Sequence, residues 1–125
     1  MPPLTAFDKL VSLEPGSSAS AIRNVPNTLA IFDSHFPHFP VLPGVLALGT
    51  LEALAAALLR DADGRPWRLA QAQQVGFRHF VQPGDQMALT VRITERSDAE
   101  AVLSGEVKVD DRIVIRARKL RMIPR

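Results

Sequence analysis

The sequence predicts an α+β protein in which a curved antiparallel sheet wraps around one central helix. Residues 44–59 contain no proline, are rich in alanine and leucine, and place apolar side chains around most of a helical wheel. Short β-type segments precede this stretch, and longer alternating segments follow it. A single small sheet cannot cover an apolar helix on every side. We therefore expect a strongly curved sheet and a second copy of the chain, that is, a dimer.

The remaining elements follow from alternation and turn residues. We expect residues 1–8 to form a helical turn or a loose arm. Strands are predicted at residues 10–13 and 18–25, then 67–80, 87–96, 101–109 and 112–123. Gly, Pro, Asp and Ser mark turns at residues 14–17, 61–66, 81–85, 97–100 and 110–111. Nothing in this order suggests a repeat or a linker, so residues 1–125 are interpreted as a single domain.

Composition excludes several functional classes. The chain of 125 residues has no cysteine, which excludes disulfides, thiolate metal sites and a cysteine nucleophile. A net charge of +2, one Trp and no Tyr argue against a nucleic-acid partner. The helical stretch is too short for a membrane span and contains Thr50 and Glu52. The first residues do not resemble a signal peptide, so a cytoplasmic protein is the default expectation. We expect no cofactor and no metal.

Basic residues crowd the C-terminal part of the chain, and twelve of the fifteen Lys and Arg residues are arginine. Two interpretations remain open. These side chains can form the solvated face of a strand, or they can form a docking patch for an acidic partner. The residues concerned are Arg112, Arg116, Arg118, Lys119, Arg121 and Arg125.

The stretch before the helix has the character of a rigid loop. Pro37, Pro40 and Pro43 each fix one backbone angle and disfavour helix at the preceding residue. This loop should hold His35 in one place. The helix then begins at Gly44, where free N–H groups and the helix dipole can bind an oxyanion.

These residues resemble the motif of the FabZ-type beta-hydroxyacyl-acyl carrier protein dehydratases, a FabA/FabZ-type family with the hot-dog fold. The family's spacing of histidine, prolines and glycine is matched by His35-Phe36-Pro37 and Pro40-Val41-Leu42-Pro43-Gly44-Val45-Leu46. The first hairpin, residues 13–25, and the strand and Pro-Gly-Asp turn, residues 75–86, are similar to the same family. The resemblance covers nearly the whole chain and implies a hot-dog fold.

The resemblance also implies roles for individual residues. His35 would remove a proton from the carbon next to a thioester, and the N–H groups of Gly44 and Val45 would hold the thioester oxygen. Phe36, Pro43 and Gly49 would line the substrate site. The substrate would be an acyl chain carried on the phosphopantetheine arm of an acidic acyl carrier protein.

The chain departs from the family pattern at three positions, two of which carry polar side chains in the family. Gly49 stands where the family has its Glu or Asp acid, Ala53 replaces a glutamine, and Ser34 replaces the glycine before the histidine. Glu52 lies about 60° round the helix and about 4.5 Å along it from Gly49. A carboxyl group in apolar surroundings retains its proton, as a general acid requires. Glu52 is therefore a candidate substitute acid.

Alternatives stay open for several of these side chains. Glu52 can instead lie at the dimer seam and pair with an arginine. Asp33 is a weaker candidate acid, and His38 and His79 are interpreted as surface or strand residues. His35 can be a loop histidine that is satisfied by backbone groups.

Three functions remain possible. The protein can dehydrate or hydrate a 3-hydroxyacyl thioester, or it can be a half-catalytic subunit that pairs with a related dehydratase. Thioester hydrolysis in the same pocket is the third possibility.

Overall fold

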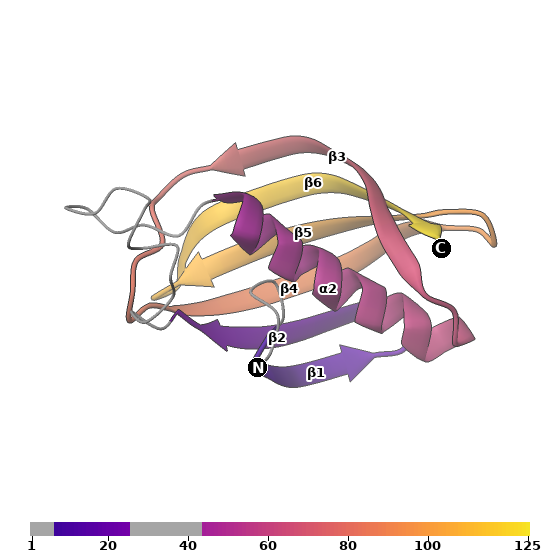
Figure 1. The fold of residues 1–125 in the computed structure, drawn as a ribbon, viewed down its shortest axis with the longest axis horizontal. Coiled ribbons are helices and arrows are strands. Elements are labelled where there is room, and N and C mark those ends of the chain that lie inside the picture. Colours follow the sequence, from indigo (N-terminus) through magenta and orange to yellow (C-terminus); the bar gives the residue numbers. More distant parts are fainter. Residues whose placement is uncertain (1–6, 26–43) are drawn as a thin grey trace.

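The computed structural model describes residues 7–25 and 44–125, and every element predicted in these ranges is present (Figure 1). One helix follows two short strands and precedes four longer ones. The elements are β1 (Lys9–Glu14), β2 (Ser18–Asn24), α2 (Gly44–Asp63), β3 (Trp67–Phe77), β4 (Gln86–Arg96), β5 (Ala101–Val109) and β6 (Arg112–Pro124).

The strands form a single antiparallel sheet in the order β1-β2-β4-β5-β6-β3. Strand β3 follows the helix in sequence but pairs with β6, so β1 and β3 are the two edge strands. Figure 1 shows α2 lying across one face of this curved sheet. The predicted arrangement of a bent sheet around one helix is confirmed.

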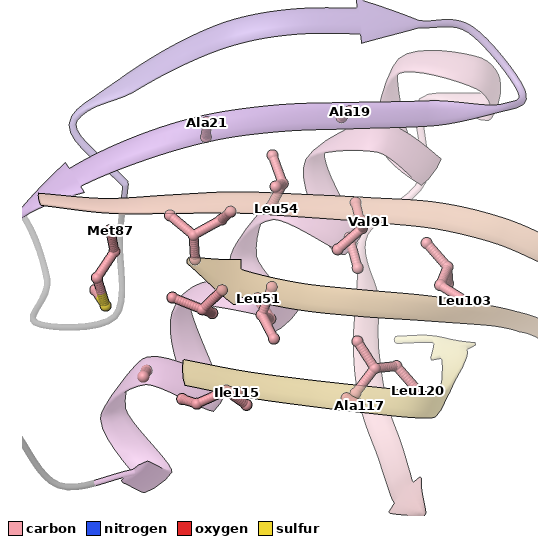
Figure 2. Close-up of a cluster of buried hydrophobic side chains, with 14 of the residues drawn as sticks. Ala19, Ala21, Leu51, Leu54, Met87, Val91, Leu103, Ile115, Ala117 and Leu120 are labelled. Atoms are coloured by element: carbon pink, nitrogen blue, oxygen red, sulfur yellow. The ribbon is translucent and has the colours of Figure 1, made fainter. Parts of the chain in front are cut away.

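The core lies between α2 and the sheet. Leu51 and Leu54 are fully buried and lie among inward-pointing side chains of the central strands, including Val91 and Leu103 (Figure 2). Gly105 of β5 lies where the helix meets the sheet, because a Cβ there would lie 3.2 Å from Leu120 of β6 and 3.4 Å from Leu51 of α2.

One flank of α2 is less deeply buried. Leu48, Glu52 and Ala56 recur at helical spacing and are only half-buried. The apolar side chains of the neighbouring edge strand, Leu69 and Val75, are also half-buried. Within one chain the sheet covers one side of the helix. The half-buried flank borders the edge strand β3, whose apolar side chains are also half-buried.

The C-terminal end of α2 is held by a compact polar cluster around Asp63. Its carboxylate accepts hydrogen bonds from the Arg65 backbone N–H at 2.8 Å, the Trp67 ring N–H at 3.2 Å and Arg96 at 2.9 Å. The guanidinium groups of Arg65 and Arg96 lie 5.0 and 5.6 Å from the centre of the Trp67 ring. The backbone N–H of Arg65, together with the N–H of Trp67 and the Arg65 guanidinium, lowers the pKa of Asp63 from 3.8 to about 2.

Two predicted boundaries are wrong. The helix continues through residues 61–63, which were expected to form a turn, because Asp63 is bonded to the start of β3 and Gly64 ends the helix. Gly64 has φ +72° and donates its N–H to the carbonyl of Arg60, as in a left-handed helix cap. Strand β3 ends at Phe77 rather than Phe80, although the Arg78 N–H still donates to the carbonyl of Val114 at 2.8 Å.

Candidate active site

Val25 and Gly44 flank residues 26–43, and each contacts the end of β3 or the turn that follows it. The Val25 N–H donates to the carbonyl of Asp85 at 2.9 Å, and the Val25 carbonyl accepts from Gly84 at 2.7 Å. Gly84 has φ +90°, which the Pro-Gly-Asp turn requires. At the other side, Gly44 contacts Phe77. His35, Phe36 and Pro43 lie outside the described residues, so their predicted roles remain predictions.

The helix begins at Gly44, where the sequence predicts it. A Cβ built on Gly44 would lie 2.5 and 2.8 Å from atoms of the Phe77 ring, so only glycine fits there without a shift of the ring. Backbone N–H groups in the first turn of a helix have no intrahelical acceptor. The N–H groups of Gly44 and Val45 belong to that turn, which is what an oxyanion site needs.

A hollow lies beside this helix start. It has a volume of about 290 Å³ and is lined by Phe77, Arg78, His79 and Phe80. Phe77 and Phe80 expose 56% and 68% of their surface, which is unusual for aromatic residues next to a core. The hollow therefore combines apolar area with two basic side chains.

Glu52 lies on the half-buried flank of the helix, between α2 and β3. Its Oε1 accepts a hydrogen bond from the Leu69 backbone N–H at 2.9 Å. Leu69 stands next to an irregularity in the pairing of β3 with β6, where the register shifts between Leu69 and Gln71. Among the described residues Glu52 forms no ion pair with an arginine. Its observed partner is a backbone N–H, which no pattern in the sequence predicts.

Gly49 and Ala53 share this part of the helix with Glu52. Both are half-buried, and neither carries a side chain that can donate or accept a proton. The described part of the site thus offers one carboxyl group, that of Glu52, three residues after the position of the family acid.

Arg23 is a buried cation on the inner side of β2. It is only 7% exposed and follows Ala19 and Ala21 on the same face, an alternation that is visible in the sequence. Burial lowers the pKa of Arg23 from its usual range, and the carboxylate of Asp8 opposes this shift. The alternation predicts an inward position, but it does not predict that an arginine occupies the buried face of β2.

The structure, in residues 7–25 and 44–125, contains no group of three or more His, Cys, Asp and Glu side chains able to hold a metal ion. No helix in these same ranges is long and apolar enough to cross a membrane. His79 is exposed at the end of β3, as expected for a surface residue.

Six antiparallel strands curved around one helix define the class of hot-dog proteins. A dehydratase heterocomplex, ApeI:P from Xenorhabdus doucetiae, superimposes with a TM-score of 0.78 over 100% of this chain and 86% of that chain, at 9% identity. An uncharacterized protein from Pyrococcus horikoshii has a TM-score of 0.74 over 95% and 82% of the two chains, at 17% identity. At these identities the likeness establishes the hot-dog fold and nothing more.

Sequence relatives define the family. A family model of ApeI-like proteins, described as ApeI dehydratase, matches residues 12–113. The 3-hydroxyacyl-[acyl-carrier-protein] dehydratase FabZ of Clostridium tetani is 34% identical over 97% of this chain and 87% of its own length. FabZ of Bordetella petrii is 36% identical over 93% and 83%. The chain belongs to the FabA/FabZ-type family of hot-dog dehydratases.

Proposed function

We propose that this protein eliminates water from 3-hydroxyacyl thioesters carried on an acyl carrier protein, and adds water in the reverse direction. The observation that carries the proposal is the start of α2 at Gly44, with first-turn N–H groups beside the hollow at Phe77. Relatives named as 3-hydroxyacyl-[acyl-carrier-protein] dehydratases match nearly the whole chain and support the same reaction.

The proposed reaction needs a base, an oxyanion site and an acid. His35 removes a proton from the carbon next to the thioester carbonyl, and negative charge develops on the carbonyl oxygen. The N–H groups of Gly44 and Val45 stabilise this oxygen. The bond between carbon 3 and its hydroxyl oxygen then breaks, and an acid protonates the departing oxygen to give water and a 2-enoyl thioester.

Glu52 is the proposed acid. Its Oε1 is occupied by the Leu69 N–H, which leaves Oε2 for the proton that must be transferred. This hydrogen bond fixes the carboxyl group between α2 and β3, on the flank that a second copy of the chain would cover. Glu52 would then serve a site shared between two subunits, as the family resemblance implies for its acid.

Two substitutions separate the acid role of Glu52 from a structural one. Glu52→Gln keeps an oxygen that can accept the Leu69 N–H but cannot donate the proton of a carboxylic acid, whereas Glu52→Ala removes both. If Glu52 is the acid, both variants lose dehydration, by about 10²–10⁴-fold, and only Glu52→Ala also loses thermal stability. Activity of Glu52→Gln equal to wild type would remove Glu52 from the chemistry.

The reaction itself is tested with purified protein and a 3-hydroxyacyl carrier protein. Mass spectrometry of the carrier protein distinguishes loss of water from release of a free acid, and so separates dehydration from thioester hydrolysis. His35→Ala should abolish water loss, by roughly 10²–10⁴-fold, while the matched change His38→Ala in the same stretch should not. Equal activity of the two variants would contradict the assignment of His35.

A half-catalytic role is favoured by one specific observation. Because of Gly49 and Ala53, the described helix has no polar side chain at the family's acid and glutamine positions. In that case the protein pairs with a related dehydratase that supplies the acid, and the half-buried flank of α2 is the contact. An inactive homodimer that gains activity when it is co-purified with such a relative would establish this second function.

The partner and location belong to the same proposal. The carrier protein is acidic, and the hollow at the helix start offers Arg78 and His79 beside exposed Phe77 and Phe80. This combination suits a partner that brings negative charge and an apolar acyl chain. A homodimer or mixed dimer in the cytoplasm remains our expectation.

A further inference from the structure

The face of the sheet that points away from α2 carries a second hollow. It has a volume of about 280 Å³ and lies over the middle of strands β4, β5 and β6. Its floor includes the backbone of Gly105 and Ala117, whose positions face the core. Its walls are outward-pointing side chains: Thr90, Arg92, Ser104, Glu106, Arg116 and Arg118.

Strand register arranges these side chains in two rows. Arg92 of β4 pairs with Ser104 of β5. On the other side of Ser104 the register between β5 and β6 shifts, so that Arg118 and Lys119 both lie opposite it. The first row is therefore Arg92, Ser104 and Arg118. The second row is Thr90, Glu106 and Arg116. Neighbouring strands lie about 4.8 Å apart. The short Ser104 side chain between two long arginines is what makes the surface hollow.

Charge is unevenly compensated within the hollow. Glu106 lies 3.7 Å from both Arg116 and Lys108, which is long for an ion pair. Arg92 and Arg118 form no ion pair with any carboxylate of residues 7–25 and 44–125. Three guanidinium groups and two hydroxyl groups therefore converge on a space that contains one carboxylate.

This chemistry selects an anion with several oxygens. Guanidinium groups bind phosphate through two parallel hydrogen bonds, and the hydroxyl groups of Thr90 and Ser104 add further donors. A second copy of the same face would bring like charges together and is disfavoured. A carboxylate has only two oxygens to satisfy donors that approach from both sides of Ser104.

We propose that this outer hollow is a binding site for a diphosphate group, with Arg92 and Arg118 holding it above Ser104. The site lies on the opposite face of the sheet from α2, and it does not depend on the proposed dehydratase function. The diphosphate can be free or part of a nucleotide.

Isothermal titration calorimetry at low ionic strength tests the site with two probes, inorganic pyrophosphate and ADP. We expect saturable binding of pyrophosphate, and binding of ADP of similar strength if the diphosphate alone is recognised. ADP binding that is much tighter would assign the site to a nucleotide. Succinate, a dicarboxylate, should bind more weakly than either, and equal binding of succinate would overturn the proposal.

Single substitutions of the arginines and of the glutamate should change the affinity for pyrophosphate in opposite directions. Arg92→Gln and Arg118→Gln should each weaken pyrophosphate binding roughly ten- to hundredfold, since each removes a charge-assisted contact. Glu106→Gln should tighten binding, because it removes a like charge and releases Arg116. The matched control is Arg68→Gln, an exposed arginine on β3 outside the hollow.

General attraction of anions to a basic surface predicts a different result. Arg68→Gln would then weaken binding as much as Arg92→Gln and Arg118→Gln, and the proposal would be wrong. Circular dichroism and the backbone amide signals of residues 90–118 establish that each variant is folded. In the wild type, pyrophosphate should shift the amide signals of Ser104 and Arg118 first, and an unchanged spectrum at saturating probe would also overturn the site.

Discussion

The two ends of α2 are built in opposite ways. At the C-terminal end, the Asp63 carboxylate accepts three kinds of donor, and Trp67 and Arg96 tie the helix to two strands. At the N-terminal end, Gly44 has no side chain and lies against the half-exposed ring of Phe77. Among the described residues, side-chain hydrogen bonds hold one end, and packing of backbone against an aromatic ring marks the other. The second end is the one at which we propose that the thioester oxygen binds.

Removal of the Trp67 ring should have the largest effect on stability. Trp67 is 3% exposed and donates its ring N–H to Asp63. Trp67→Ala should lower the free energy of unfolding by about 3–5 kcal/mol, because a large buried ring leaves a cavity. Urea denaturation followed by circular dichroism measures this loss.

Trp67→Phe provides the control for that experiment, because it keeps most of the ring but removes the N–H donor. Its loss should be clearly smaller. If both variants lose the same stability, the hydrogen bond to Asp63 dominates, and the explanation of the loss by a cavity is wrong.

A methyl group at the other end of the helix should affect activity more than stability. Gly44→Ala forces the Phe77 ring to move, and the ring can move because 56% of its surface is exposed. The N–H groups of the first turn then shift, and kcat/KM for the 3-hydroxyacyl carrier protein should fall roughly tenfold or more. A variant that loses stability but keeps kcat/KM would remove the contrast between the two ends.

Acid should weaken the C-terminal end in a defined pH range. The pKa of Asp63 falls from 3.8 in the unfolded chain to about 2 in the folded protein, so the ionised form stabilises the fold. This contribution is complete above about pH 4 and is lost as the pH falls towards 2. Urea denaturation of wild type and Asp63→Asn at several pH values should show a stability gap that closes over this range. A gap that widens on acidification would contradict the assignment.

The sequence predicted the framework well because apolar periodicity decides it. The start of the helix at Gly44, the strand β5 and the curved antiparallel sheet follow from patterns that involve neighbours along the chain. The helix end was misjudged, because Asp63 in a run of turn-forming residues is held by Arg65, Trp67 and Arg96. Contacts with Arg96, distant in sequence, leave no local signal.

The motif in the sequence predicts which residues form the site, but the contacts around them depend on the three-dimensional fold. The role of Gly44 as a glycine follows from the motif, but its contact with Phe77 depends on the pairing of β3 with β6. The bond from Leu69 to Glu52 arises at a register shift that no sequence pattern announces. The C-terminal basic cluster divides in the same way, because Arg121 pairs with Glu100 whereas Arg116 and Arg118 line the outer hollow.

The attachment of Val25 to the Pro-Gly-Asp turn uses only main-chain groups, contributed by Gly84 and Asp85. Every residue type has a backbone carbonyl, and every type except proline has a backbone N–H, so these two hydrogen bonds do not depend on the side-chain chemistry of Val25 or Asp85.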